Sequence, residues 1–193
     1  MKQSKVIVLT GGIGSGKSAA AKILSERYPV YSSDEISREV IFRPEVQKEI
    51  ASRLTARYFG PDGLDRKGFG RWVFADSERT RILNEIMHRA IYDELLRLTK
   101  GKQGLVFAEI PLYFETGANF PCDEVWVVTA ERERRIRRTM ERDGLTRGEV
   151  EDRMKRQIQI ENVKTAYTEI ENNGTTQDLR RALARALENA GGK

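Results

Sequence analysis

Eight residues near the amino end of the chain have the types and spacing of a phosphate-binding loop. They read GGIGSGKS from Gly11 to Ser18 and fit the pattern G-x-x-x-x-G-K-[ST] at every required position. Glycines let the backbone curl so that successive N–H groups point at phosphate oxygens, an approach that side chains would block. Lys17 can reach the β- and γ-phosphates, and the Ser18 hydroxyl can ligate Mg²⁺.

The residues on either side of this loop also fit a phosphate loop. Residues 5–9 have the pattern of a buried strand and residues 18–27 that of a helix, whose amino end adds its dipole to the anion site. A glycine-rich turn that binds nothing is therefore disfavoured, and we expect a nucleoside triphosphate here. Its predicted contacts are Gly12, Ile13, Gly14, Ser15, Gly16, Lys17, Ser18 and Ala19. The loop does not identify the acceptor of the phosphoryl group.

Three carboxylates lie at or shortly after the ends of predicted strands. Asp34 follows the second strand, at the carboxyl end where α/β sheets place their ligands. It is either a base or orienting group for an acceptor hydroxyl, or a first-turn carboxylate that merely suits the helix dipole. Glu109 ends the third strand, where a carboxylate can hold Mg²⁺ or its waters, and Glu115 follows six residues later. We favour Glu109 over Glu115 for the metal, with a surface carboxylate as the alternative for both.

A predicted helix after the fourth strand carries six arginines between Arg132 and Arg142. Half of them would form a solvated face with neighbouring glutamates at i,i+3 or i,i+4 spacing. This set contains Arg132, Arg134 and Arg137 with Glu131, Glu133 and Glu141. Arg138 and Arg142 lie four apart on one face, just before a glycine-ended turn. Guanidinium groups closing over a triphosphate would stabilise the charge that builds on the transferring phosphoryl, so this pair predicts a lid.

The remaining chemistry-bearing residues point to no other class of site. The single histidine, His88, lies within a helical pattern, where a lone histidine is usually structural. The sequence has no Cys/His cluster with zinc-binding spacing. It also lacks an Asn-Lys-x-Asp segment of the kind that reads guanine, which argues against a GTPase.

Strand-like and helical segments alternate along the chain, which predicts an α/β fold around a parallel sheet. The predicted strands are 5–9, 29–31, 105–110, 125–129 and 170–171. The predicted helices include 18–27, 44–58, 77–99, one closed by Gly144, one from a Thr146–Glu149 capping box to about 159, and a last amphipathic helix with Leu179, Leu183 and Leu187. Most of 36–100 is thus helical, an insertion over the substrate rather than a second sheet domain.

Within this insertion, the pattern of apolar residues predicts which side chains face inward. They are Val46, Ile50, Leu54, Ile82, Ile86, Ile91, Leu95 and Leu98. Residues 60–63, Gly-Pro-Asp-Gly, predict a turn.

Composition restricts the class of protein. The net charge is +5 and the pI about 9.4, but 29 acidic residues are interleaved with 34 basic ones, as suits a polyphosphate-binding enzyme. We therefore do not expect nucleic acid as a partner. No apolar run approaches 18 residues, and Met1 to Ser4 leads straight into the first strand without room for a signal peptide. A single cysteine, Cys122, fits a reducing compartment, so we expect a soluble, cytoplasmic protein.

Several motifs together resemble the dephospho-CoA kinase family. The resemblance runs in chain order through TGGIGSGKS, SDEISREV, LDRKGFGRWVF, LNEIMH, IPLYFE, RRTMERDGLT and NNG, and covers nearly the whole chain. Many kinases share the phosphate loop. The combination of LN-x-x-x-H, PL-x-x-E and R-x-x-x-RDG-x-T is much more specific.

The resemblance implies transfer of a phosphoryl group from ATP, with Mg²⁺, to the 3′-hydroxyl of the ribose in dephospho-CoA. It implies a three-layer P-loop kinase with a central parallel five-stranded sheet, arranged as a core (1–35, 101–130, 160–193), a helical acceptor-binding region (36–100) and a lid (131–159). The sequence leaves the oligomeric state open, and we favour a monomer. In the family pattern, Asp34 matches the residue proposed to activate the acceptor hydroxyl, and Arg138 and Arg142 match the lid arginines. Asn84, His88 and Glu115 match acceptor-side positions, and Asn173 an ATP-binding position.

The sequence departs from the family pattern at three places. Ser32-Ser33-Asp34 stands where the family usually has Asp-Ala-Asp, His88 is followed by Arg89 rather than Pro, and Ala166-Tyr167 replaces Ala-Asp. The first change removes one of two carboxylates, and the third alters the loop near the expected adenine. Two other functions stay open, a kinase of another small acceptor and a non-catalytic, nucleotide-dependent binding protein that touches RNA with its basic helix.

Overall fold

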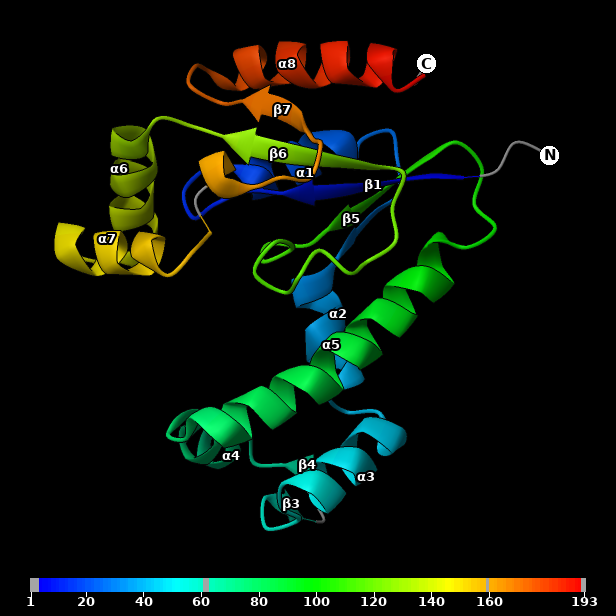
Figure 1. The fold of residues 1–193 in the computed structure, drawn as a ribbon, viewed down its shortest axis with the longest axis vertical. Coiled ribbons are helices and arrows are strands. Elements are labelled where there is room, and N and C mark those ends of the chain that lie inside the picture. The colour runs from blue at the N-terminus through cyan, green and yellow to red at the C-terminus, as the bar shows by residue number, and fades with distance from the viewer. Residues whose placement is uncertain (1–3, 61–62, 159, 192–193) are drawn as a thin grey trace. The chain divides into compact units, whose positions relative to one another are not determined.

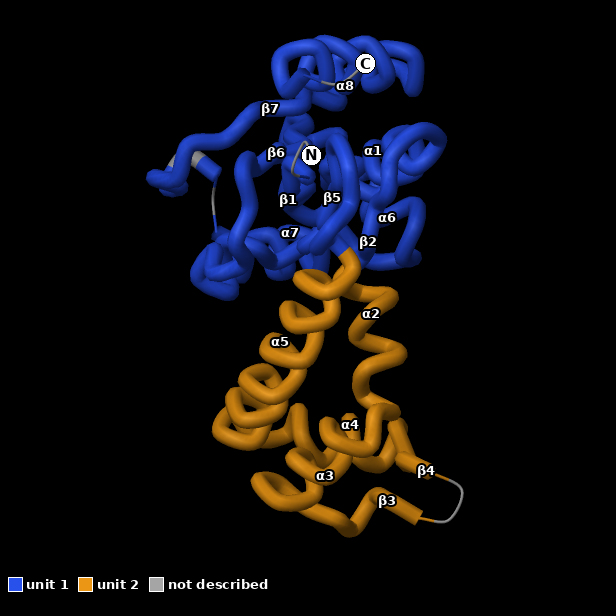
Figure 2. The backbone as a smooth tube through the Cα atoms, turned by 90° about the vertical axis from the view of Figure 1, so that its right-hand side faces the viewer, with its two compact units in different colours: residues 1–32, 99–193 blue, residues 33–98 orange. Residues whose placement is uncertain are grey.

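The computed structural model describes residues 4–60, 63–158 and 160–191, and the chain divides into two compact units. The first unit contains Met1–Ser32 and Thr99–Lys193, and the second contains Ser33–Leu98 (Figure 2). The predicted helical insertion, 36–100, and the second unit cover nearly the same residues. Gln159, the predicted end of one helix, and Pro61 and Asp62 of the predicted turn lie outside the described residues.

The first unit is built on a five-stranded sheet whose paired strands are all parallel, as the sequence predicts. The strands follow the order β2-β5-β1-β6-β7 across the sheet. They are β1 Lys5–Thr10, β2 Val30–Ser32, β5 Leu105–Glu109, β6 Glu124–Thr129 and β7 Thr168–Glu171. Leu9 of β1 pairs in register with Glu109 on one side and Trp126 on the other, so the carboxyl ends of these strands reach one edge of the sheet.

Two helices bury the apolar core of this unit. They are α1, Lys17–Leu24, and α8, Thr176–Asn189, which contact each other and share one hydrophobic cluster with the sheet (Figure 1). Within this cluster Phe107 and Trp126 are fully buried and meet edge to face, with ring centroids 5.3 Å apart. Leu179 and Leu183 of α8 are buried as predicted, and Leu187 packs partly buried against them.

A helical hairpin, α6 Arg132–Asp143 and α7 Arg147–Lys155, follows β6. Gly144 ends α6 with a left-handed φ of 67°, and Thr146 and Glu149 form the predicted capping box of α7. The predicted extension of α7 toward residue 159 is wrong, because the helix ends at Lys155. There the N–H groups of Arg156 and Gln157 turn to the carbonyls three residues back. A short 3₁₀ turn, η1 Ile160–Asn162, follows.

The second unit is helical apart from a short hairpin. Its elements are α2 Ser33–Val40, α3 Pro44–Arg53, β3 Phe59–Gly60, β4 Gly63–Leu64, α4 Arg66–Phe74 and α5 Ser77–Thr99, whose last residue belongs to the first unit. The predicted bounds of α5 are confirmed. The antiparallel pair β3–β4, which flanks the predicted turn, was not anticipated. Buried Val46, Ile50 and Ile86 lie in the core of this unit, with Leu54 and Ile82 packed partly buried against it.

Two further predicted helices also extend too far. The helix predicted over 44–58 ends at Arg53, where the N–H groups of Leu54 and Thr55 both bond to the Ile50 carbonyl and the Thr55 hydroxyl then accepts from Arg57. Likewise the helix predicted to residue 27 ends at Leu24, and the Ser25 hydroxyl donates to a carbonyl of the last turn. In both cases a hydroxyl side chain competes with the helical hydrogen bonds.

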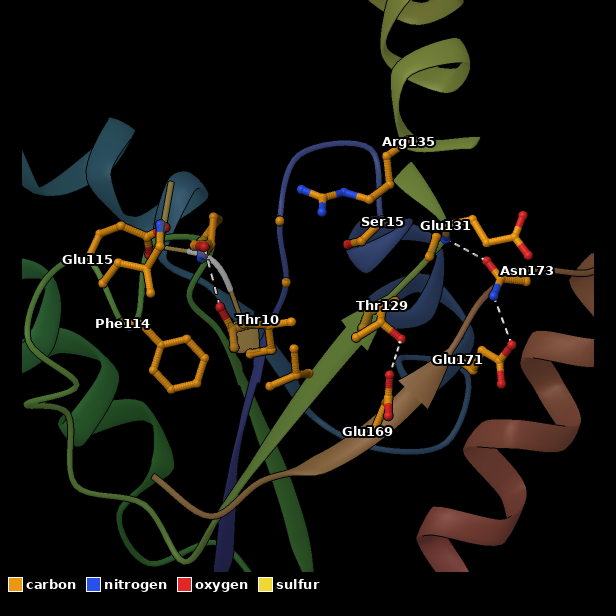
Figure 3. A pocket seen from close by; sticks show the side chains of 18 residues that line it. Thr10, Ser15, Phe114, Glu115, Thr129, Glu131, Arg135, Glu169, Glu171 and Asn173 are labelled. Atoms are coloured by element: carbon orange, nitrogen blue, oxygen red, sulfur yellow. Dashed lines mark hydrogen bonds between the residues drawn. The ribbon is translucent and has the colours of Figure 1, made fainter. Parts of the chain in front are cut away.

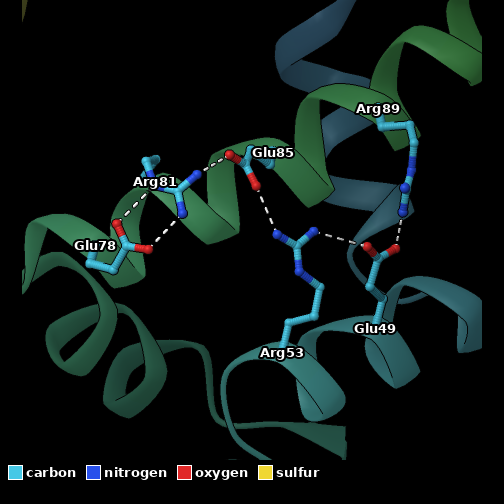
Figure 4. A network of polar contacts seen from close by, with 6 residues as sticks. All are labelled: Glu49, Arg53, Glu78, Arg81, Glu85 and Arg89. Carbon is cyan, nitrogen blue, oxygen red and sulfur yellow. Dashed lines mark hydrogen bonds and ion pairs between the residues drawn. The ribbon is translucent and has the colours of Figure 1, made fainter.

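Alternating charges connect α3 to α5 within the helical unit (Figure 4). Arg53 of α3 bonds to Glu49 on its own helix at 3.2 Å and to Glu85 of α5 at 2.7 Å. Arg89 of α5 pairs back to Glu49, and Arg81 joins Glu85 to Glu78. Exposed pairs contribute little singly, but this chain of contacts constrains how two helices pack.

A buried carboxylate in the same unit should make its stability depend on pH. Glu94 of α5 is 7% exposed and pairs with Arg97 at 2.6 Å and Arg43 at 2.9 Å. The hydrogen bond from Arg97, with the charge of Arg43, lowers the pKa of Glu94 to about 2 from its ordinary value of 4.5. We expect Glu94→Gln to lower the free energy of unfolding at pH 7 by about 1.5–3 kcal/mol, the scale of hydrogen bonds to a charged group.

The sign of this dependence follows from the lowered pKa. The stabilisation is present above pH 4.5 and is lost as the pH falls toward 2, so the difference between Glu94→Gln and wild type should shrink across that window. Urea unfolding at pH 7, 4 and 3 measures it, with Glu45→Gln on the exposed surface of α3 as control. A difference that stays constant with pH would contradict the assigned role of Glu94.

Candidate active site

The glycine-rich loop connects β1 to α1 as the sequence predicts. Gly16 caps the helix in a left-handed conformation, with φ 95°, and its carbonyl accepts from the N–H groups of Ala19 and Ala20. The Ser15 N–H bonds to the Gly12 carbonyl at 3.1 Å and tightens the curl. The loop therefore lies at the amino end of α1, where the helix dipole favours an anion.

Helix α6 packs so closely on this loop that only glycine fits at one position. A Cβ on Gly14, whose φ is 74°, would lie 2.3 Å from the carbonyl oxygen of Arg135 and 2.7 Å from the Thr139 hydroxyl. Both of those residues belong to α6, and Thr139 is fully buried. Gly14 thus permits two backbone segments to touch, in addition to leaving room for a phosphate.

Lys17, Ser18 and Glu109 lie together at the carboxyl edge of the sheet. A carboxylate oxygen of Glu109 is 3.8 Å from the Lys17 ammonium and 3.4 Å from the Ser18 hydroxyl oxygen. Glu109 is 9% exposed. These are the two residues predicted to bind metal and the lysine predicted to bind phosphate, and all three are side by side.

The donor set at this place fits Mg²⁺. A hydroxyl and a carboxylate are hard oxygen ligands, and Mg²⁺ in kinases is commonly held by one or two protein oxygens together with substrate phosphates. Among the described residues, no group of three or more His, Cys, Asp and Glu forms an all-protein metal site. The arrangement therefore suits a metal that arrives with the nucleotide.

The arginines of α6 divide into two groups. Arg134 pairs with Glu131 and Arg137 with Glu141 at the predicted spacing. Arg132 pairs instead with the adjacent Glu133 and with Glu151 of α7, and its side chain is exposed as predicted. Arg138 instead reaches the phosphate loop and donates to the Ser15 carbonyl at 3.4 Å and the Asn172 carbonyl at 3.1 Å. The Arg142 side chain is 62% exposed and bonds to Asp143, which raises the pKa of Arg142. Its role in the lid stays a prediction.

Three residues that contact the loop were not anticipated. Arg135 donates to the Ile13 carbonyl at 2.9 Å, while Gln157 accepts from the Ile13 N–H at 2.8 Å. Asn172, next to the predicted Asn173, donates to the Ser15 carbonyl at 2.8 Å. Arg135 could have been found because it shares a helix face with Arg138, three residues on. Nothing in the sequence indicates the contacts of Gln157 and Asn172.

A cavity of ≈ 340 Å³ opens beside the loop (Figure 3). Phe114 and Glu115 lie on one side, and Thr129, Glu169 and Asn173 lie on the other. The Ser15 hydroxyl also lines it and is buried with no hydrogen-bond partner among the described residues. Such an orphaned polar atom in a cavity indicates a place that a ligand or water can satisfy.

Two predicted site residues are placed by hydrogen bonds around this cavity. Glu115 accepts from the Ile158 N–H at 3.1 Å, which ties the segment after β5 to the segment after α7. The Asn173 side chain accepts from the Glu131 N–H at 2.7 Å and donates to Glu171 at 2.8 Å. Asn173 therefore fixes the start of α6 against the end of β7.

The other predicted acceptor-side residues belong to the helical unit. Asp34 lies in the first turn of α2, and its backbone carbonyl accepts from the Ser37 hydroxyl. Asn84 is exposed on α5. His88, also on α5, is half-buried and stacks on Tyr92 with ring centroids 6.4 Å apart, and burial lowers its pKa. The acceptor roles of these three residues stay predictions.

Comparison with known proteins identifies the family. The sequence model of dephospho-CoA kinase matches residues 5–178. The chain belongs to the dephospho-CoA kinase family. A dephospho-CoA kinase of Geobacter sulfurreducens is 37% identical over 186 residues, which cover 92% of this chain and 94% of the relative. The resemblance found in the sequence motifs is thereby confirmed.

Solved structures agree with this membership. The crystal structure of TT1252 from Thermus thermophilus has a TM-score of 0.79 at 37% identity, covering 97% of this chain and 98% of that one. A dephospho-CoA kinase from Campylobacter jejuni has a TM-score of 0.63 at 25% identity, covering 97% of both chains. The predicted P-loop kinase fold is confirmed. Over the part of the chain that the structure describes, no helix is long and apolar enough to cross a membrane.

The Ser18–Glu109 pair predicts a change in metal requirement. We expect Ser18→Ala to raise the Mg²⁺ concentration needed for half-maximal activity by about tenfold or more, because one oxygen ligand is lost. Titration of activity with Mg²⁺ at saturating ATP measures this, with the exposed Ser25→Ala as control. An unchanged Mg²⁺ titration would remove Ser18 from the metal site.

Proposed function

We propose that this chain transfers the γ-phosphoryl group of ATP to the 3′-hydroxyl of the ribose in dephospho-CoA, giving CoA and ADP. Membership of the dephospho-CoA kinase family over 5–178 is the observation that carries the choice of acceptor. The loop geometry and the cluster of Lys17, Ser18 and Glu109 support ATP as donor. This would be the last step of coenzyme A biosynthesis, in a cytoplasmic and monomeric enzyme.

Donor-side residues would bind and polarise the triphosphate. The loop N–H groups, from Gly12 to Ala19, hold the phosphate chain, and Lys17 neutralises the β- and γ-oxygens. Ser18 and Glu109 would hold Mg²⁺, which would supply positive charge to the triphosphate when bound. Arg138 lies within reach of the loop, and its charge stabilises the transferring group.

On the acceptor side, Asp34 would orient the ribose hydroxyl and take its proton late in the transfer. Asn84, His88 and Glu115 would contact the rest of dephospho-CoA. The corresponding domain scheme is a core (1–35, 101–130, 160–193), an acceptor region (36–100) and a lid (131–159). Arg142 and Asn173 would complete the ATP site from the lid and the end of β7.

A coupled ADP-release assay with alternative acceptors tests this function. Dephospho-CoA, AMP, shikimate and gluconate are offered at equal concentration with ATP and Mg²⁺. We expect turnover with dephospho-CoA alone, and Lys17→Ala should nearly abolish it because the charge on the β- and γ-phosphates is no longer neutralised. Turnover with another acceptor would assign a different kinase, whereas salt-sensitive RNA binding without turnover would favour a binding protein.

For the acceptor side, Asp34→Asn should lower kcat by about 10²-fold or more, the scale of positioned acid–base catalysis. The substitution keeps the shape and a hydrogen-bond acceptor but removes the basic charge. Single-turnover transfer and calorimetric ATP binding are measured on the same variant, and ATP affinity should change little. Collapse of ATP binding would place Asp34 in the metal site, and wild-type transfer would leave it a helix-terminus carboxylate.

For the lid, Arg138→Ala and Arg142→Ala should each lower kcat more than they weaken ATP binding, because lid contacts strengthen in the transition state. Steady-state kinetics with dephospho-CoA separate kcat from KM. Arg137→Ala, on the solvated face of the same helix, is the matched control. A variant that raises only KM would show that its arginine binds the substrate and the transition state equally strongly.

A further inference from the structure

The Ser15 carbonyl in the phosphate loop is held by two donors from distant parts of the chain. Asn172 Nδ2 lies 2.8 Å from this oxygen and Arg138 Nη1 lies 3.4 Å from it. Arg138 also donates through Nη2 to the backbone carbonyl of Asn172, at 3.1 Å. Loop, lid arginine and the residue after β7 therefore form one closed set of hydrogen bonds.

Asn172 is itself firmly fixed. It is 7% exposed, and its N–H donates to the Thr129 carbonyl at 2.9 Å, which continues the pairing of β6 and β7 by one residue. A Cβ on Gly16 would lie 2.0 Å from the Asn172 amide nitrogen, so Gly16 leaves the room that this amide occupies. The position of Asn172 and the missing side chain of Gly16 thus both permit this hydrogen bond.

Peptide geometry gives this contact a functional consequence. In a trans peptide the C=O of one residue and the N–H of the next point in opposite directions. Holding the Ser15 carbonyl toward Asn172 turns the Gly16 N–H the other way, toward the side of the loop where the proposed triphosphate would lie. A carbonyl released from this contact could rotate toward the phosphate, where its negative end would repel the anion.

We propose that Asn172 is a positioning residue for the triphosphate. Its amide orients the Ser15–Gly16 peptide, and its backbone carbonyl holds the Arg138 guanidinium beside the same peptide. This inference rests on the proposed use of ATP as donor and does not depend on the identity of the acceptor.

A double-mutant cycle on ATP binding tests the coupling. Asn172→Ala and Arg138→Ala should each raise the Kd for ATP by about tenfold or more, the scale of one misplaced N–H bond from the loop to a charged phosphate. Because both side chains hold one carbonyl, the double variant should lose clearly less than the product of the two single effects. Isothermal titration calorimetry gives the Kd values, and thermal unfolding of each variant is followed in parallel.

The control cycle pairs Asn172→Ala with Arg134→Ala, an arginine of the same helix that pairs with Glu131. In this control cycle the two single effects on the Kd for ATP should multiply in the double variant. Should Asn172→Ala fail to fold, both cycles are repeated with Asn172→Leu, which keeps a similar size and removes the donor without adding a charge. An unchanged Kd for ATP, or equal coupling in both cycles, would overturn the proposal and leave Asn172 a packing residue. These cycles measure ATP binding alone, so their result does not depend on whether dephospho-CoA is the acceptor. The ADP-release assay tests the acceptor separately.

Discussion

The orientation of the peptide groups between Ile13 and Gly16 is the constraint on which this site depends. N–H groups hold an anion when the carbonyls that precede them face away from it, and each of those carbonyls then needs a hydrogen-bond donor from the protein or from water. Arg135 supplies one for Ile13, and Asn172 with Arg138 supplies one for Ser15. Helix α6 and Asn172, the residue after β7, therefore contact the phosphate loop through its backbone carbonyls.

The sheet register makes these contacts possible. β1 pairs in parallel with β5 and β6, and β6 pairs in parallel with β7. This backbone pairing alone brings the carboxyl ends of four strands to one edge of the sheet. Glu109 arrives beside Lys17 and Ser18 because it pairs with Leu9, one residue before the end of β1. Asn172 reaches the loop because its N–H extends the β6–β7 ladder to Thr129.

The parts predicted well from sequence are those with strong local signals. The phosphate loop, the buried strands, the glycine end of α6 and the capping boxes each depend on residues close together in the chain. Helix ends at Leu24 and Arg53 were missed because serine and threonine side chains there compete for backbone partners. Asn172 and Gln157 were missed for a different reason. Their partners lie more than a hundred residues away, and no local pattern reports such contacts.

The departures from the family pattern have physical consequences of their own. Arg89, in place of the usual proline, pairs with Glu49 and so joins the charge network between α3 and α5. Ser32 is aligned in register with Glu109 on the neighbouring strand. A second carboxylate at that position would place a like charge in register with Glu109, which weakens a sheet pair. Serine adds no like charge there, and Glu109 keeps its ion pair with the Lys17 ammonium, at 3.8 Å.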